Sequence, residues 1–114
     1  MNITFYYGAD SFRIREAMEK RAAVFRAKFQ KGIVEKLDFE KENCLEDLED
    51  IFKRRSFFDE PELIIVYAYL SAKDLPKKDE KLFKFLNQEA KEIKEFENLR
   101  GMALEKWVLE KVTE

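Results

Sequence analysis

The residues best placed for chemistry near the N-terminus are Gly8, Asp10 and Ser11, which follow an apolar stretch and precede a helical pattern. A glycine turn between a strand and a helix is where many α/β proteins bind phosphate, because the N–H groups at a helix N-terminus attract anions. A working phosphate loop needs a second glycine, a lysine and a hydroxyl at set spacing, and dinucleotide binding needs three glycines. Phe12 and Arg13 stand where these residues would be. We therefore interpret the segment as a turn glycine and a helix cap, and expect no cofactor.

Acidic residues are the second candidate for chemistry. Asp10, Asp38 and Asp59 lie near the ends of predicted strands, where α/β domains can hold magnesium. Acids at strand ends are also common on ordinary surfaces, and the acidic residues within 40–50 are most simply the solvated face of a helix. The chain has no histidine, which excludes Ser-His-Asp triads, Cys-His pairs, histidine proton shuttles and the usual zinc sites. We assign no catalytic residue and no metal site.

Composition indicates one folded domain spanning residues 1–114. Hydrophobic residues make up 46% and aromatic residues 14% of the chain, which is too much for a disordered protein. The net charge of −2 argues against a broadly basic surface for nucleic acid. No apolar run approaches the length of a membrane span, and the N-terminus lacks the pattern of a secretory signal. The single cysteine, Cys44, fits a reducing compartment, so we expect a cytoplasmic protein.

Hydrophobic periodicity alternates between strand and helix along the chain. Period-two alternation or a continuous apolar run predicts strands at 2–7, 33–39, 63–67 and, weakly and at an edge, 92–96. Apolar residues at steps of three and four predict helices at 11–31, 43–55, 76–90 and 101–113. We expect Gly32 to end the first helix in a left-handed cap. The order predicts an α/β fold with a three-layer open, mainly parallel sheet of about four strands and helices on both faces.

Two adjacent aromatic residues, Phe57 and Phe58, stand between a predicted helix and a predicted strand, with charges on both sides. On a short helical turn, neighbouring side chains point about 100° apart, so one element cannot easily bury both. One interpretation is that one ring packs inward and the other covers the sheet edge. The other is an exposed apolar wedge for a partner's pocket, because aromatic anchors dominate interface energies.

A family resemblance rests on four stretches in order along the chain. They are FYYGADSFRIRE at 5–16, VEKLD at 34–38, SFF ahead of LIIV at 56–58 and 63–66, and KLFKFL, EF and LEKWV at 81–86, 95–96 and 104–108. The chain resembles the N-terminal domain of the delta subunit of the bacterial DNA polymerase III clamp loader. This family is related to AAA+ proteins and has lost the nucleotide site, so the resemblance implies a degenerate P-loop in an AAA+-like fold.

The resemblance implies a non-catalytic DNA replication protein that binds the sliding clamp (the beta subunit) and helps to open it. In the family an apolar residue followed by Phe, on a short helix before the third strand, enters a hydrophobic pocket of the clamp. This pair corresponds to Phe57 and Phe58, flanked by Ser56, Arg55 and Asp59. Phe57 replaces the more usual Leu. Other clamp-loader subunits are further candidate partners, and any DNA contact is expected to be indirect or weak.

Two departures from the family pattern affect this expectation. The family has a further helix and strand before the stretch matched at Lys81, whereas 72–78 bridges that gap here, which predicts a sheet one strand short. The helix expected at 101–113 would lead into a lid domain, and the sequence ends at Glu114. Two alternatives stay open. One is a small phosphate-binding or phosphate-transferring α/β enzyme that uses Gly8 and Asp10, and the other is an interaction domain for another partner.

Overall fold

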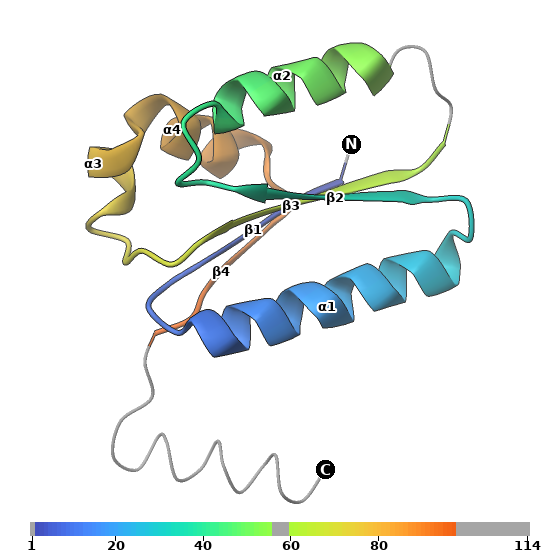
Figure 1. The fold of residues 1–114 in the computed structure, drawn as a ribbon, viewed down its shortest axis with the longest axis horizontal. Coiled ribbons are helices and arrows are strands. Elements are labelled where there is room, and N and C mark those ends of the chain that lie inside the picture. The colour runs from blue at the N-terminus through green and yellow to red at the C-terminus, as the bar shows by residue number, and fades with distance from the viewer. Residues whose placement is uncertain (1, 56–59, 98–114) are drawn as a thin grey trace, which may run out of the picture.

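The computed structural model describes residues 2–55 and 60–97, and it shows helices alternating with the strands of a single sheet (Figure 1). The elements are β1 (Asn2–Tyr7), α1 (Ser11–Lys28), β2 (Ile33–Asp38), α2 (Cys44–Arg55), β3 (Glu62–Ala68), α3 (Leu75–Lys78), α4 (Glu80–Glu89) and β4 (Glu92–Glu95). The predicted helix at 101–113 lies outside the described residues.

The sheet has four strands in the order β2-β3-β1-β4, and each neighbouring pair is parallel. β3 is central, and its residues Leu63 to Val66 are completely buried because both faces of the strand are covered. β4 lies at an edge and is exposed along its whole length, as its charge-rich sequence predicts.

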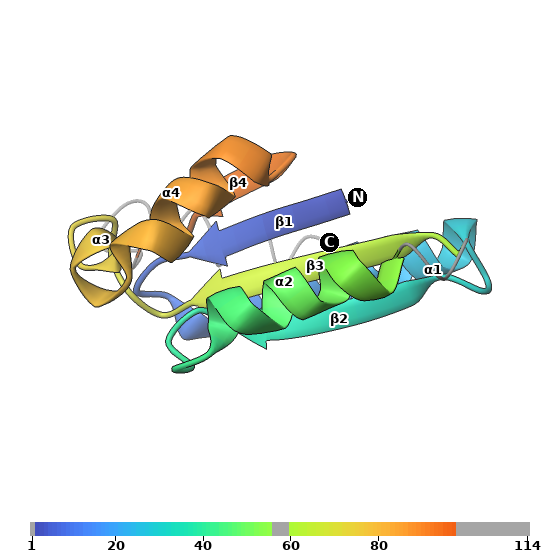
Figure 2. The ribbon, with the colours of Figure 1, turned by 90° about the horizontal axis from the view of Figure 1, so that it is seen from above.

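Helices cover both faces of the sheet, which confirms the three-layer α/β fold. α1 packs on one face, and α2, α3 and α4 pack on the other (Figures 1 and 2). The alternation in β1 sends Ile3 and Phe5 to the α2–α4 side and Tyr6 to the α1 side. The apolar stripe of α1 is buried as predicted, at Ile14, Met18, Ala22 and Phe25.

The end of α1 differs from the prediction. The helix stops at Lys28, and Phe29 takes an extended conformation in which its N–H still donates to the carbonyl of Phe25. Gly32 is therefore not a left-handed cap, and Gly8 is the one described glycine with positive φ. The reason for glycine at position 32 is space, because an added Cβ would lie 2.6 Å from Cε1 of Phe25. Glycine is therefore needed at position 32 because of side-chain packing and not because of the backbone conformation.

The helix predicted from Pro76 is divided into two. Asp79 adopts an extended conformation that ends α3 and begins α4, where its side chain accepts a hydrogen bond from the N–H of Leu82. Aspartate favours this arrangement because its short carboxylate satisfies the free N–H groups of a new helix. Leu75 on one side of the break and Leu82 on the other are both completely buried. None of the helices in the described ranges is both long and apolar enough to cross a membrane.

Candidate functional site

The loop after β1 is closed by a later part of the chain. Gly8 has φ of 140°, and its N–H donates to the carbonyl of Ala68 at 3.1 Å. A Cβ on Gly8 would lie 2.0 Å from the carbonyl oxygen of Phe96. Both the backbone angle and the close approach require glycine here. Gly8, which the sequence predicts as a turn glycine, makes room here for the backbone of Phe96.

The first turn of α1 is likewise occupied by residues that follow β4. The N–H of Asp10 donates to the carbonyl of Phe96 at 3.1 Å, and the carboxylate of Asp10 accepts the N–H of Arg13 at 3.1 Å. The Arg13 guanidinium donates to the carbonyl of Glu97 at 3.3 Å and lies 5.4 Å from the centre of the Phe96 ring. The Phe96 carbonyl and the Asp10 carboxylate therefore already accept two of the backbone N–H groups at this helix N-terminus. Asp10 is a cap, as predicted.

The Phe96 side chain anchors this arrangement. It is 4% exposed and packs edge-on against the ring of Tyr6, with 5.4 Å between the centroids. The backbone N–H of Phe96 donates to the carbonyl of Tyr7 at 2.7 Å. The Tyr6 hydroxyl donates to Glu92 at 3.1 Å, and burial, with the nearby Glu92 carboxylate, raises the pKa of Tyr6 to about 12. Sequence reasoning placed Phe96 in a weak strand and missed this role, because no local pattern shows a contact with residues 86 to 90 positions earlier.

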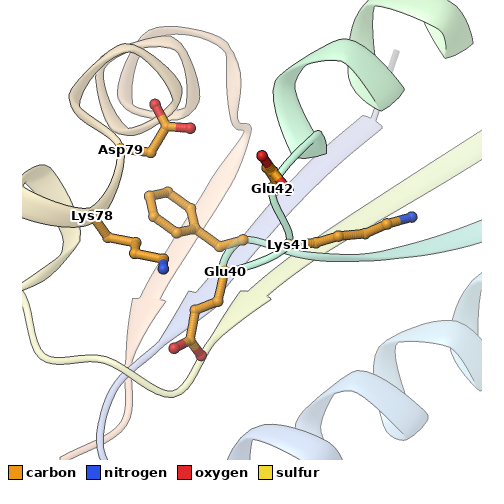
Figure 3. A pocket seen from close by; sticks show the side chains of 6 residues that line it. Glu40, Lys41, Glu42, Lys78 and Asp79 are labelled. Atoms are coloured by element: carbon orange, nitrogen blue, oxygen red, sulfur yellow. The ribbon is translucent and has the colours of Figure 1, made fainter.

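A hollow lies beyond the C-terminal end of β2, at the same end of the parallel sheet as the Gly8 loop (Figure 3). It measures about 330 Å³ and is lined by Phe39, Glu40, Lys41, Glu42, Lys78 and Asp79. The lining mixes both signs of charge over the ring of Phe39, and Asp79 is already engaged in capping α4. No local sequence pattern predicts this hollow, because its two walls come from segments around positions 40 and 78.

Of the three acidic residues that the sequence singles out, Asp10 and Asp38 lie in the described part of the chain, and each is engaged in local backbone contacts. The carboxylate of Asp38 accepts the N–H of Glu40 at 2.9 Å in a turn, and Asp10 caps α1. Asp59 lies outside the described residues. Within 2–55 and 60–97, no group of three or more potential ligand side chains is placed to hold a metal ion.

Cys44 begins α2, as the sequence predicts, and is 1% exposed. Burial, followed by the nearby Asp47 and Asp38 carboxylates, raises the pKa of its thiol to about 12. The thiol form therefore persists at neutral pH, and the side chain acts as a small apolar group in the core.

The predicted clamp-binding residues Phe57 and Phe58, with Ser56 and Asp59, lie outside the described residues, and Arg55 is the last residue of α2. The residues on either side of this segment are described, and they are joined to the sheet by Arg54.

A single nitrogen of Arg54, Nη2, donates to Glu35 in β2 and to Glu62 in β3, each at 3.0 Å. Hydrogen bonds to Glu35 and Glu62 raise the pKa of Arg54, so its positive charge is secure. The Glu62 side chain is only 7% exposed, and the N–H of Ile33 donates to the carbonyl of Pro61 at 2.9 Å. The last turn of α2 and the residue before β3 therefore both hydrogen-bond to β2, the first through Glu35 and the second through Ile33.

Comparisons with protein-family models, with curated proteins and with solved structures found no match to this chain.

Proposed function

We propose that this chain is a non-catalytic DNA replication protein that binds the sliding clamp through Phe57 and Phe58 and favours its open form. The proposal rests on the sequence resemblance to the clamp-loader delta subunit. It includes a cytoplasmic location, which the single buried Cys44 fits. Binding shifts the clamp toward the open form only in proportion to the difference in affinity for the two forms.

The observation that carries the proposal is the occupied N-terminus of α1. A nucleotide-binding α/β protein uses this place for phosphate, but here the Phe96 carbonyl accepts the N–H of Asp10 and lies against Gly8. A phosphate that used the N–H of Asp10 would have to displace the hydrogen bond of that N–H to the Phe96 carbonyl. The same feature weighs against the alternative of a phosphate-transferring enzyme that uses Gly8 and Asp10. It fits a family that keeps the α/β scaffold and has lost nucleotide binding.

The contacts of Arg54 give a second, separate support. They join Arg54, three residues before Phe57, to Glu62 in β3 and to Glu35 in the edge strand β2. Attaching both ends of a short connection lowers the conformational entropy that its residues lose on binding. β3 begins at Glu62, whereas Gly8 follows the end of β1, so in this parallel sheet Glu62 and Gly8 lie at opposite ends of the strands. The proposed interface therefore makes no use of the phosphate-type loop.

The test is surface plasmon resonance with an immobilised bacterial sliding clamp. Buried aromatic anchors contribute 2 kcal/mol or more each, so Phe57→Ala and Phe58→Ala should each weaken binding by about 30-fold. The matched control is Phe12→Ala, which removes a ring that is 58% exposed on α1 and should leave the affinity unchanged. Equal binding by the parent and the Phe57→Ala/Phe58→Ala variant would contradict the assigned residues. Absence of saturable binding by the parent would contradict the function and favour another partner.

A further inference from the structure

β4 leaves one edge of the sheet open among the described elements. It is the last strand in the order β2-β3-β1-β4, and within residues 2–55 and 60–97 the strand that pairs with it is β1. Every residue of β4 is exposed, including the apolar Ile93, which is 40% exposed. The open edge of a strand presents N–H and C=O groups that can pair with a strand of another chain.

The backbone of β4 is oriented for such pairing at Ile93 and Glu95. Alternate residues of a strand in a parallel pair direct both their N–H and C=O groups to the same neighbour. The N–H of Phe96 donates to the carbonyl of Tyr7 at the end of β1, so Lys94, two residues earlier, faces β1 as well. The N–H and C=O groups of Ile93 and Glu95 therefore point away from β1, to the open edge.

The charges along this edge are complementary to themselves when the strand is reversed. Residues 91–95 read Lys-Glu-Ile-Lys-Glu. In an antiparallel pair of two copies centred on Ile93, Lys91 lies opposite Glu95 and Glu92 lies opposite Lys94, and the two-fold symmetry repeats both pairs. Every charged pair then joins opposite signs, and the two Ile93 side chains meet at the centre. Cross-strand pairs of both kinds stabilise a sheet.

Neighbouring registers lack this property. Moving one copy along by one residue places Glu92 opposite Glu95, or Lys91 opposite Lys94, depending on the direction. Moving it by two residues places the two Lys94 residues, or the two Glu92 residues, opposite each other. Like charges directly opposite each other destabilise a pair of strands. The sequence therefore favours a single register, which charges that served only to protect the edge would not need to do.

We propose that two copies of this chain associate through antiparallel pairing of β4, with the two-fold axis between the Ile93 residues. The two four-stranded sheets then form one continuous sheet, and the N–H of each Ile93 donates to the carbonyl of the other. The contact is short, so the association is reversible and depends on concentration. It is independent of clamp binding, because Arg54 contacts Glu35 in β2, at the opposite edge of the sheet.

Sedimentation equilibrium over about a hundredfold range of concentration tests the association. The mean mass of the parent should rise from 13.7 kDa toward twice that value. Lys91→Glu opposes like charges in both symmetry-related pairs with Glu95, so the dissociation constant should increase at least about tenfold. The matched control is Lys73→Glu, which makes the same change of charge at an exposed residue between β3 and α3 and should associate like the parent. Circular dichroism should show the same secondary structure in both variants.

A mixture of two variants tests the register. Glu95→Lys alone should weaken association as much as Lys91→Glu, because it opposes a lysine to Lys91 of the other copy. Mixed together, the two variants should associate about as tightly as the parent, since each chain supplies the charge that the other lacks. A parent that stays at 13.7 kDa over the whole range, or a Lys91→Glu variant that associates like the parent, would overturn the proposal. A mixture that associates no better than either variant alone would also overturn it.

Discussion

Gly8→Ala tests the contact between the β1 loop and Phe96. A side chain at φ of 140° costs about 1–3 kcal/mol, and the Phe96 carbonyl must also move, because it would lie 2.0 Å from the new Cβ. That movement weakens the hydrogen bonds that join Phe96 to Asp10 and Tyr7, at about 1 kcal/mol each. The expected loss is therefore about 3–5 kcal/mol of unfolding free energy. At 4–8 °C per kcal/mol, Tm should fall by at least about 12 °C.

The assay is thermal and urea unfolding followed by circular dichroism, with Ala9→Ser as the control. Ala9 is exposed in the same loop, so this change adds one heavy atom without meeting Phe96 and should alter stability by less than about 0.5 kcal/mol. An unfolding free energy of Gly8→Ala within about 1 kcal/mol of the parent value would contradict this expectation. It would mean that the Phe96 carbonyl does not press against this loop.

Three further predictions concern ligands, ionisation and the core. Millimolar ATP or GTP with magnesium should leave Tm unchanged, whereas a nucleotide at 100 times its Kd would add about 2.7 kcal/mol. The phenolate absorbance of Tyr6, identified by comparison with Tyr6→Phe, should appear near pH 12, and Glu92→Gln should lower that pKa. Because the folded pKa lies above the ordinary value of 10.0, this contribution to stability is complete below pH 10 and is lost between about pH 10 and 12. Leu82→Ala should cost about 2–5 kcal/mol in urea unfolding by leaving a cavity, and Ile93→Ala, at a side chain 40% exposed, should cost less than about 1 kcal/mol.

The fold was predictable where periodicity reports burial directly. The run from Leu63 to Val66 predicts a strand covered on both faces, and the steps from Ile14 to Phe25 predict the buried side of α1. Both are local patterns that any hydrophobic core imposes on the elements beside it. The edge position of β4 could be predicted because its residues are mostly charged.

The sequence did not reveal contacts between distant segments. Position 32 requires glycine because the ring of Phe25 leaves no room for a Cβ. The helix is broken at Asp79, which adopts an extended conformation and caps α4, although the apolar spacing on its two sides predicts one continuous helix. The missing lysine after Gly8 is the basis for expecting no phosphate binding, but it does not indicate that the Phe96 backbone lies against Gly8. That contact joins the residues that follow the first and the last described strands, and neither local pattern predicts it. The assignment of Phe57 and Phe58 comes from the family resemblance and stays a prediction.

Binding of the clamp by Phe57 and Phe58 can be mapped by NMR of the isotope-labelled chain titrated with unlabelled sliding clamp. We expect saturable changes that centre on residues 55–61 and extend to Arg54 and its partners. Resonances of the loop after β1, around Gly8, should stay unchanged. Changes that centre on Gly8 and Asp10 and leave 55–61 unaffected would show that this site is wrong, and a spectrum that the clamp does not alter would show that the chain does not bind it.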